Sequence, residues 1–345
     1  MRTRPIALLA VALVMSAFVA SCSKPSEPAA STSTRPTTKA AASRAAGDTS
    51  AAKGMTIALV PKGAEHVFWQ TVIAGAKAAA EEVGATVDVK APDAETNVEQ
   101  QIQIIESYTT KGVDAIVMAA CDKDSLIPYL KTAKDKGIII SVIDSGISEP
   151  ELAVTYAATD NVLGGKRAAE KLAELIGNEG SVVVIPFIQG AQSSDEREKG
   201  FTDEIAKHPN ISLLPPLFSK SQVEEAVKVT ENLLSAHPEV KGIFAANEPG
   251  AKGVAQVLKQ QGLQGKVMLV GFDAAKDEVQ DLKDGVIQAL VIQDPFKMGY
   301  EGVKAAIDTK LGKPVEKRID TGVIVVTPDN LNDPDVKKVL DSQVG

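Results

Sequence analysis

The sequence predicts an α/β protein with two doubly wound lobes, each built on a parallel sheet. From residue 55 onward, short runs of apolar and β-branched residues alternate with stretches of helical periodicity. Several runs, such as 138–140 and 182–185, are apolar at every position, which is typical of strands buried on both faces of a parallel sheet. Strict alternation of strand and helix predicts βαβ units.

The elements follow this pattern along the chain. Strands are expected at 56–60, 86–90, 113–118, 138–143, 152–157, 181–185, 211–217, 242–246, 266–271, 286–292 and 323–326. Between them, residues 67–83, 161–176 and 223–234 show the i, i+3, i+4 spacing of amphipathic helices. A short helix is expected after Asp333. These strands are too many for one compact sheet, so two halves are predicted, the second restarting near Asp160.

The first residues resemble the signal of a bacterial lipoprotein. Arg2 and Arg4 precede an apolar run over 6–20, which suits a signal peptide and is short for a membrane span. The run ends in small residues followed by Cys22, as in a lipobox, where the cysteine thiol accepts a lipid before cleavage. We therefore expect 1–21 to be a signal peptide, Cys22 to be lipidated, and the protein to be extracytoplasmic and membrane-anchored.

The remaining chain divides into a tether and two predicted lobes. Residues 22–53 are rich in Ser, Thr, Ala and Pro and contain no large apolar residue, so a disordered tether is expected after the lipidated cysteine. The N-terminal lobe is expected to comprise 54–159 and 294–320. The C-terminal lobe is expected to comprise 160–293 and 321–345.

Composition argues against several classes of protein. The formal net charge is −8 and the basic residues are dispersed, which argues against nucleic-acid binding. Once Cys22 is lipidated only Cys121 remains, so neither an intrachain disulfide nor a cysteine metal site is expected. No glycine-rich phosphate motif or nucleophile motif follows a strand. We therefore predict a monomeric, non-enzymatic protein without cofactor, metal or catalytic residues.

Polar and aromatic side chains follow the predicted strands. Open parallel sheets bind ligands beyond the carboxyl ends of their strands, so these residues are candidates for a binding site. They include Lys62, His66, Phe68, Trp69, Asp144, Arg197, Asn247, Asp273 and Gln293. Carboxylates, amides and arginine satisfy hydroxyls, which both donate and accept hydrogen bonds. Aromatic rings pack against the apolar faces of sugars, so the set favours a polyhydroxylated ligand.

From residue 56 to about 328 the chain resembles the ribose-binding-protein branch of the type I periplasmic binding proteins. The matching motifs are Ile57-Ala58-Leu59-Val60, Phe68-Trp69, Val142-Ile143-Asp144, Asp160-Asn161-Val162-Leu163-Gly164-Gly165, Arg197-Glu198-Lys199-Gly200-Phe201, Asn232-Leu233-Leu234 with His237-Pro238, Phe244-Ala245-Ala246-Asn247 and Val270-Gly271-Phe272-Asp273. The resemblance implies two lobes that close on a ligand like a hinged clamp, joined by crossings near Thr159, Asp294 and Asp320.

The resemblance also implies roles for the candidates. The sugar contacts of the family fall on Phe68, Trp69, Asp144, Arg197, Asn247, Asp273 and Gln293. The implied function is that of the substrate-binding lipoprotein of an ABC importer, which captures a small polyhydroxylated ligand, by family a monosaccharide, and passes it to permease subunits. A receptor that presents a sugar to a chemosensor or sensor kinase is compatible with the same features.

Three positions differ from the ribose-binding pattern. Lys62 replaces a small hydroxyl residue, His66 replaces an asparagine, and Ala119 aligns with another asparagine. Lys62 resembles the autoinducer-2-binding relatives, although their acidic pair has no match around Asp195. Autoinducer-2 and polyols therefore stay open as ligands beside pentoses and hexoses. Lys62, His66 and Ser193 are further candidate contacts, and His66 has the alternative role of capping the helix that follows it.

Overall fold

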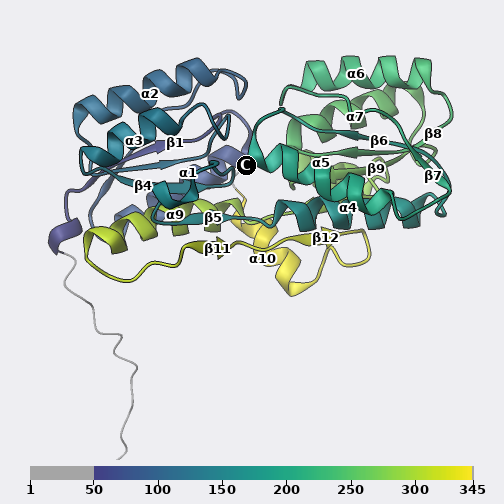
Figure 1. Cartoon of the computed structure of the whole chain (residues 1–345). Coiled ribbons are helices and arrows are strands. Elements are labelled where there is room, and N and C mark those ends of the chain that lie inside the picture. Colours follow the sequence, from purple (N-terminus) through teal and green to yellow (C-terminus); the bar gives the residue numbers. More distant parts are fainter. Residues whose placement is uncertain (1–49, 344–345) are drawn as a thin grey trace, which may run out of the picture. The chain divides into compact units, whose positions relative to one another are not determined.

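The structure is a computed structural model that describes residues 50–343, within a compact unit that spans residues 47–345. Two sheets flanked by helices form two lobes (Figure 1). The first sheet has the strand order β11-β5-β4-β3-β1-β2, and the second has the order β12-β10-β9-β8-β6-β7. All pairs are parallel except β10 with β12, which are antiparallel. The predicted fold class of two doubly wound parallel-sheet lobes is therefore confirmed.

The first sheet and its helices make the N-terminal lobe. Its strands are β1 Thr56–Val60, β2 Thr86–Val89, β3 Ala115–Met118, β4 Ile139–Ile143, β5 Tyr156–Ala158 and β11 Arg318–Asp320. Its helices are α1 Val67–Glu81, α2 Val98–Lys111, α3 Ile127–Asp135 and α9 Pro295–Lys310, with short 3-10 turns at Ser50–Ala52 and Pro150–Leu152. Helices α1 and α9 share one apolar cluster with the sheet, and α2 and α3 share the cluster on the opposite face.

The second sheet and its helices make the C-terminal lobe. Its strands are β6 Gly180–Ile185, β7 Ile211–Leu213, β8 Val240–Ala245, β9 Met268–Phe272, β10 Ala289–Ile292 and β12 Ile324–Val326. Its helices are α4 Asn161–Leu175, α5 Gln192–Ile205, α6 Val223–Ala236, α7 Glu248–Gln261, α8 Lys276–Lys283 and α10 Pro334–Ser342. The chain passes between the lobes after β5, after β10 and after β11. At these crossings Thr159 Oγ1 donates a hydrogen bond to the carbonyl of Gly322 (3.1 Å).

Several strand boundaries were wrong in the sequence-based prediction. The strand expected at 152–157 is a 3-10 turn followed by β5, and the strand expected at 211–217 ends at Leu213. The prediction missed β11, because its sequence Arg-Ile-Asp is exposed at the sheet edge and contains one apolar residue. Edge strands are short and polar because they need not bury both faces.

Two helix pairs approach at glycines. A Cβ at Gly165 of α4 would lie 2.0 Å from the carbonyl oxygen of Arg197 in α5, and one at Gly299 of α9 would lie 1.9 Å from that of Val72 in α1. The obstructing atoms belong to the backbone, so the contact is relieved only by moving a helix. Since α5 carries Arg197, the separation of α4 and α5 also sets the position of that side chain.

Gly165→Ala is therefore expected to lower the free energy of unfolding by about 1–3 kcal/mol, the usual effect of overpacking. Urea denaturation would measure the change. Glu170→Ala, on the same helix at a surface position, is the matched control and is expected to change stability by less than about 0.5 kcal/mol. Equal stability of the two variants would show that α4 and α5 are not packed as described.

Candidate ligand-binding site

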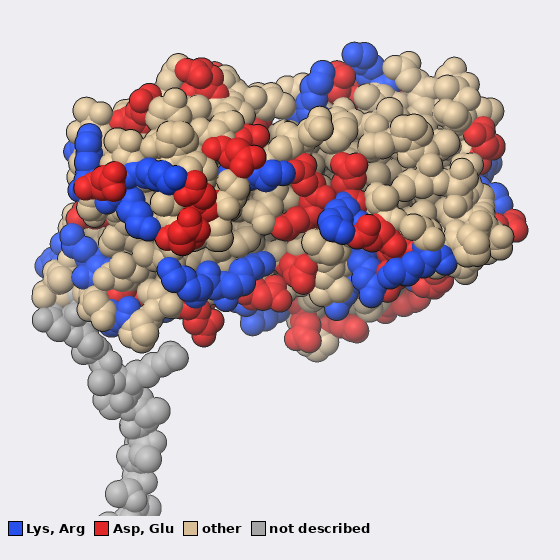
Figure 2. Space-filling view, viewed as in Figure 1, with Lys and Arg blue, Asp and Glu red and all other residues tan. Residues whose placement is uncertain are grey.

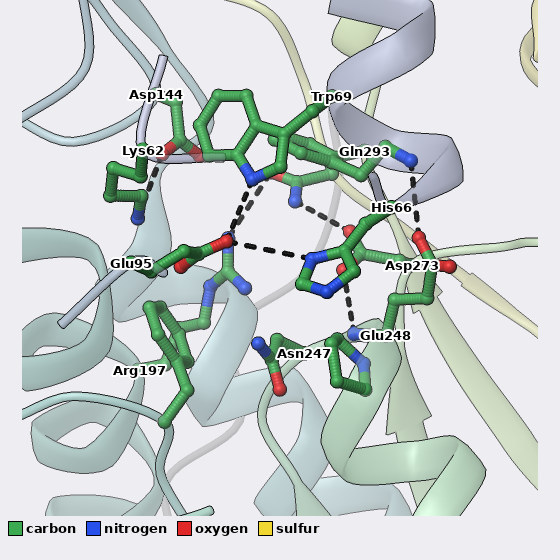
Figure 3. Close-up of a pocket in the computed structure, with 13 residues that line it drawn as sticks. Lys62, His66, Trp69, Glu95, Asp144, Arg197, Asn247, Glu248, Asp273 and Gln293 are labelled. Carbon is green, nitrogen blue, oxygen red and sulfur yellow. Dashed lines mark hydrogen bonds and ion pairs between the residues drawn. The ribbon is translucent and has the colours of Figure 1, made fainter. Parts of the chain in front are cut away.

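A pocket lies between the two lobes, at the carboxyl ends of both sheets (Figure 3). Its empty volume, which includes open solvent at its mouth, is about 290 Å³. The lining residues are Lys62, His66, Phe68, Trp69, Glu95, Asp144, Phe187, Arg197, Asn247, Glu248, Pro249, Asp273 and Gln293. Both charge signs and several aromatic rings thus face one small volume.

Lys62 is buried and connects the two lobes. Its side chain is 2% exposed, and Nζ lies 3.0 Å from Oδ2 of Asp144 at the end of β4. Nζ also donates a hydrogen bond to Oγ of Ser193 in α5 of the other lobe (3.1 Å) and lies 4.9 Å from the centre of the Phe187 ring. Lys62 is therefore a fixed part of the pocket wall.

Two aspartates follow strands in an uncommon backbone conformation. Asp144 has φ 53° and Asp273 has φ 83°, a region that residues other than glycine rarely adopt and that clusters at functional sites. Asp273 accepts hydrogen bonds from Nε2 of Gln293 (2.6 Å) and from the backbone N–H of Glu248 (3.0 Å). Burial raises the pKa of Asp273 to about 6, although the charge of Arg197 opposes the shift.

Hydrogen bonds and a ring contact fix the side chain of Arg197. Its Nε donates to Oδ1 of Asn161 (2.9 Å) and its Nη1 to the carbonyl of Ala246 (2.7 Å). Its Nη2 donates to Oε1 of Gln293 (3.3 Å), and the guanidinium lies 3.6 Å from the centre of the Phe272 ring. Burial lowers the pKa of Arg197, but an arginine stays charged in proteins. Its position is therefore set before any ligand arrives.

A second cluster on the N-terminal lobe centres on Glu95, in the loop after β2. Oε1 of Glu95 accepts a hydrogen bond from Nε1 of Trp69 (2.7 Å) and lies 3.6 Å from Nδ1 of His66. The rings of Phe68 and Trp69 meet edge to face, 4.8 Å apart. Burial would raise the pKa of Glu95, but the hydrogen bond with His66 and the charge of Lys62 outweigh it and lower that pKa to about 2.

The contact with Glu95 also shifts the pKa of His66. Burial lowers the pKa of His66, but the hydrogen bond and charge of Glu95, together with the charge of Glu248, outweigh burial and raise it above its ordinary value. His66 is the residue before α1 but makes no capping hydrogen bond through its side chain. The structure therefore places His66 with Glu95 in the pocket wall and gives no support to the capping role.

The lowered pKa of Glu95 predicts a pH-dependent contribution to stability. The folded-state value lies below the ordinary 4.5, so the contribution is present above pH 4.5 and is lost as pH falls towards 2. Glu95→Gln carries no charge at any pH. The difference in free energy of unfolding between wild type and variant should therefore shrink by roughly 1 kcal/mol between pH 5 and pH 3.5. Urea unfolding at both pH values would measure it, and a constant difference would contradict the assignment.

Glu248 begins α7 in the C-terminal lobe and reaches across to the N-terminal lobe. Its carboxylate accepts hydrogen bonds from the backbone N–H groups of Phe68 (3.1 Å) and Val67 (3.4 Å), the first residues of α1. Those N–H groups have no partner within their own helix, and a helix N-terminus attracts negative charge. Lys252 donates to the same carboxylate (2.7 Å). One lobe thus caps a helix of the other.

The structure brings together all the predicted ligand-binding residues except Ser193, which lies behind the pocket and contacts Lys62. Asn247 lines the pocket, caps α7 through a hydrogen bond from the Gly250 N–H and donates to Ser221. Sequence reasoning missed Glu95, Phe187, Glu248 and Pro249. The positions of Phe187, Glu248 and Pro249 shortly after β6 and β8 were the available signal, whereas Glu95 stands further along the loop after β2. Cys22 lies outside the described residues.

The described residues show neither a metal-binding cluster nor a membrane-spanning helix. Within 50–343, no group of three or more His, Cys, Asp or Glu side chains is arranged to hold a metal ion. In that same range, no helix has the length and apolar character that a membrane crossing requires. On the face shown in Figure 2, acidic and basic side chains are interspersed and form no basic stripe.

Comparisons with known proteins agree with this architecture. The pattern of a family described as "Periplasmic binding protein domain" matches residues 57–314. A ribose import binding protein of Escherichia coli is 29% identical over 272 residues, covering 78% of this chain and 90% of the relative. The D-allose-binding periplasmic protein of the same organism is 30% identical over 279 residues, covering 78% and 90%.

Solved structures with bound sugars are also similar. An ABC transporter solute-binding protein of Agrobacterium vitis, with bound D-fucose, has a TM-score of 0.81 and 37% identity, covering 83% of this chain and 99% of that one. A carbohydrate transporter solute-binding protein of Agrobacterium radiobacter, in complex with D-arabinose, has a TM-score of 0.80 and 34% identity, with the same coverage.

Proposed function

The chain belongs to the periplasmic binding protein family, and we propose that it captures a neutral monosaccharide between its lobes for an ABC importer. The observation that carries the proposal is the pocket itself, where Asp144 of one lobe faces Asn247 and Asp273 of the other beside the ring of Trp69. Relatives named as ribose- and allose-binding proteins support it, as do structural neighbours solved with bound D-fucose and D-arabinose.

The charge balance of the pocket favours a neutral ligand. The ammonium of Lys62 is paired with Asp144, and the carboxylate of Glu95 is paired with His66. The carboxylate of Glu248 occupies the N-terminus of α1, where an anionic group of a ligand would otherwise bind. Arg197 is the one lining cation without a salt bridge to any of residues 50–343, and the charge of Asp273 acts on it. A phosphorylated or carboxylated sugar would therefore find little uncompensated positive charge, while hydroxyls find both donors and acceptors.

Lobe closure is the proposed mechanism. We place the hinge at the crossings near Thr159, Asp294 and Asp320, between lobes comprising 54–159 with 294–320 and 160–293 with 321–345. Direct contacts link the lobes in this conformation: Lys62 with Ser193, and Lys123 with Asp195 (2.6 Å). A ligand shifts the balance between open and closed forms only by binding the closed form more tightly, so it must contact both lobes.

The membrane anchor is part of the proposal. The apolar run and the small residues before Cys22 support lipidation of that cysteine, which would hold the protein outside the cytoplasm beside permease subunits. Labelled palmitate fed to an expressing bacterium is expected to enter the wild-type chain and a Cys121→Ser control, but not Cys22→Ser. Label in Cys22→Ser would refute the assignment.

A thermal-shift screen of residues 47–345 tests the ligand class. The panel contains neutral pentoses, 6-deoxyhexoses, hexoses, polyols, autoinducer-2, sugar phosphates and aldonates. A ligand present at 100 times its Kd stabilises the native state by about 2.7 kcal/mol, which is enough to raise the melting temperature measurably. At least one neutral monosaccharide is expected to do so. A shift from autoinducer-2 or charged sugars alone would overturn the proposal.

A further inference from the structure

Glu95 combines features that its pairing with Trp69 and His66 does not fully explain. The residue is 6% exposed, yet it lines the pocket in the loop between β2 and α2. Its Oε1 takes both described contacts, with Nε1 of Trp69 and Nδ1 of His66. Its other oxygen, Oε2, accepts no hydrogen bond from any of residues 50–343. Oε2 is not fully enclosed by protein, so it can still accept a hydrogen bond from a group outside the protein.

Hydrogen bonds with residues at the start of α2 fix the loop that carries Glu95. The backbone N–H of Asp93 donates to Oε1 of Gln100 (2.7 Å), and that of Gln100 donates to the Asn97 side chain (3.1 Å). Asn97 also donates to the carbonyl of Ala94 through its backbone N–H (2.9 Å). Glu95 therefore enters the pocket from a short ordered turn on the N-terminus of α2.

We infer that Glu95 has two roles at the sugar site: its Oε1 orients the Trp69 ring through the indole N–H, and its Oε2 accepts a hydrogen bond from one ligand hydroxyl. This inference rests on the proposed function. It gives the N-terminal lobe two ligand-facing carboxylates, Glu95 and Asp144, on either side of Lys62. Asp144 pairs with Lys62 through Oδ2, and Oε2 of Glu95 adds a second acceptor, which selects for a hydroxyl at one ring position.

Trp69 gives a direct test of the positioning role. It is the only tryptophan in the chain, so its indole N–H gives one side-chain peak in a ¹H–¹⁵N NMR spectrum. In the ligand-free protein this peak is expected far downfield, because the N–H donates to a carboxylate. Glu95→Ala is expected to move it upfield, and Glu95→Gln, which keeps an oxygen acceptor, to move it less. Glu99→Gln removes a nearby exposed carboxylate and should leave it in place. An unmoved peak in Glu95→Ala overturns the positioning role.

Deoxy analogues of the tightest-binding sugar test the hydroxyl contact. For wild type, removing the hydroxyl that Glu95 binds is expected to weaken binding by about tenfold or more, as for hydrogen bonds to charged groups. In Glu95→Ala, the dissociation constants of that deoxy analogue and of the parent sugar should differ by no more than about twofold. The penalties for removing hydroxyls at other ring positions should persist. Glu99→Gln should show the wild-type pattern. If Glu95→Ala keeps every wild-type penalty, Oε2 binds no hydroxyl.

Further variants separate the effect of Glu95 on Trp69 from its direct contact with the ligand. Trp69→Phe keeps an aromatic ring but removes the N–H, so adding Glu95→Ala to it isolates the contact made by Oε2. Compared with Trp69→Phe, the double variant should again lose the penalty for removing that one hydroxyl. If the double variant keeps this penalty, Glu95 acts through Trp69 alone. If Glu95→Ala does not fold, Glu95→Gln should show a smaller fall in that one difference, because its amide binds the hydroxyl without a charge. Failure of wild type to bind any sugar would instead reject the proposed function.

Discussion

Replacing Lys62 with methionine is expected to lower the free energy of unfolding by about 3–5 kcal/mol at pH 7, because it leaves the Asp144 carboxylate buried without its cation. Methionine keeps most of the apolar stem of the side chain, so the change removes the charge together with the hydrogen bond to Ser193. Chemical denaturation at pH 7 would measure the difference.

The matched control is Lys131→Met. Lys131 pairs with Glu149 at a similar distance (2.8 Å), but both side chains are at the surface, so about 0–1 kcal/mol is expected. A second test removes both partners: Lys62→Met combined with Asp144→Leu should recover much of the lost stability, since no unpaired charge is left. Equal effects of Lys62→Met and Lys131→Met would mean that the pair is not buried as described.

Asp144→Ala and Asn247→Ala are each expected to weaken monosaccharide binding by more than about tenfold, because each removes a polar partner from a desolvated pocket wall. Calorimetric titration would measure the dissociation constants. Both variants should still unfold cooperatively, although Asn247→Ala loses the cap of α7, which is worth about 1 kcal/mol. Asp144→Ala leaves Lys62 buried without its partner, so its free energy of unfolding should fall by about 3–5 kcal/mol.

Asp135→Ala serves as the control for both, since Asp135 is an exposed aspartate at the end of α3 in the N-terminal lobe. It should bind like wild type. Normal binding by Asp144→Ala and Asn247→Ala together would remove these side chains from the site and with them the assignment of the pocket.

The rule that parallel sheets present ligands at their carboxyl ends accounts for most of the pocket. Asp144, Asn247, Asp273 and Gln293 each follow an apolar run directly, so their shared rim could be predicted from local sequence. Glu95 could not be predicted in this way, because it stands some way along a polar loop. Its burial depends on contacts with Trp69 and His66 that only the tertiary structure provides.

Glu248 and Lys62 show that contacts between distant segments could not be predicted from local sequence. Glu248 follows Asn247 directly but begins a helix, where an acidic residue is expected for local reasons alone. Its hydrogen bonds to the N-terminus of α1 join two lobes, and no local pattern encodes such a contact. The sequence marked Lys62 as unusual at its position. Its burial follows from pairing with Asp144, which a distant strand supplies.

The strands show the same division between local and non-local information. Strands buried on both faces, such as β4 and β6, were visible as apolar runs, whereas β11 at the sheet edge had no such run. The role of the glycines that let α4 approach α5 and α1 approach α9 could not be predicted either, because it depends on which helix packs against them.

Fluorescence of Trp69 during a sugar titration tests most directly whether the interlobe pocket is where the ligand binds. This ring is the chain's only tryptophan and part of the pocket wall, so its emission reports on that space alone. A neutral monosaccharide that stabilises the protein is expected to change the emission saturably, with one sugar bound per chain, and Asp144→Ala should shift the titration to higher concentration. A sugar that raises the melting temperature while leaving the Trp69 emission unchanged would contradict the account.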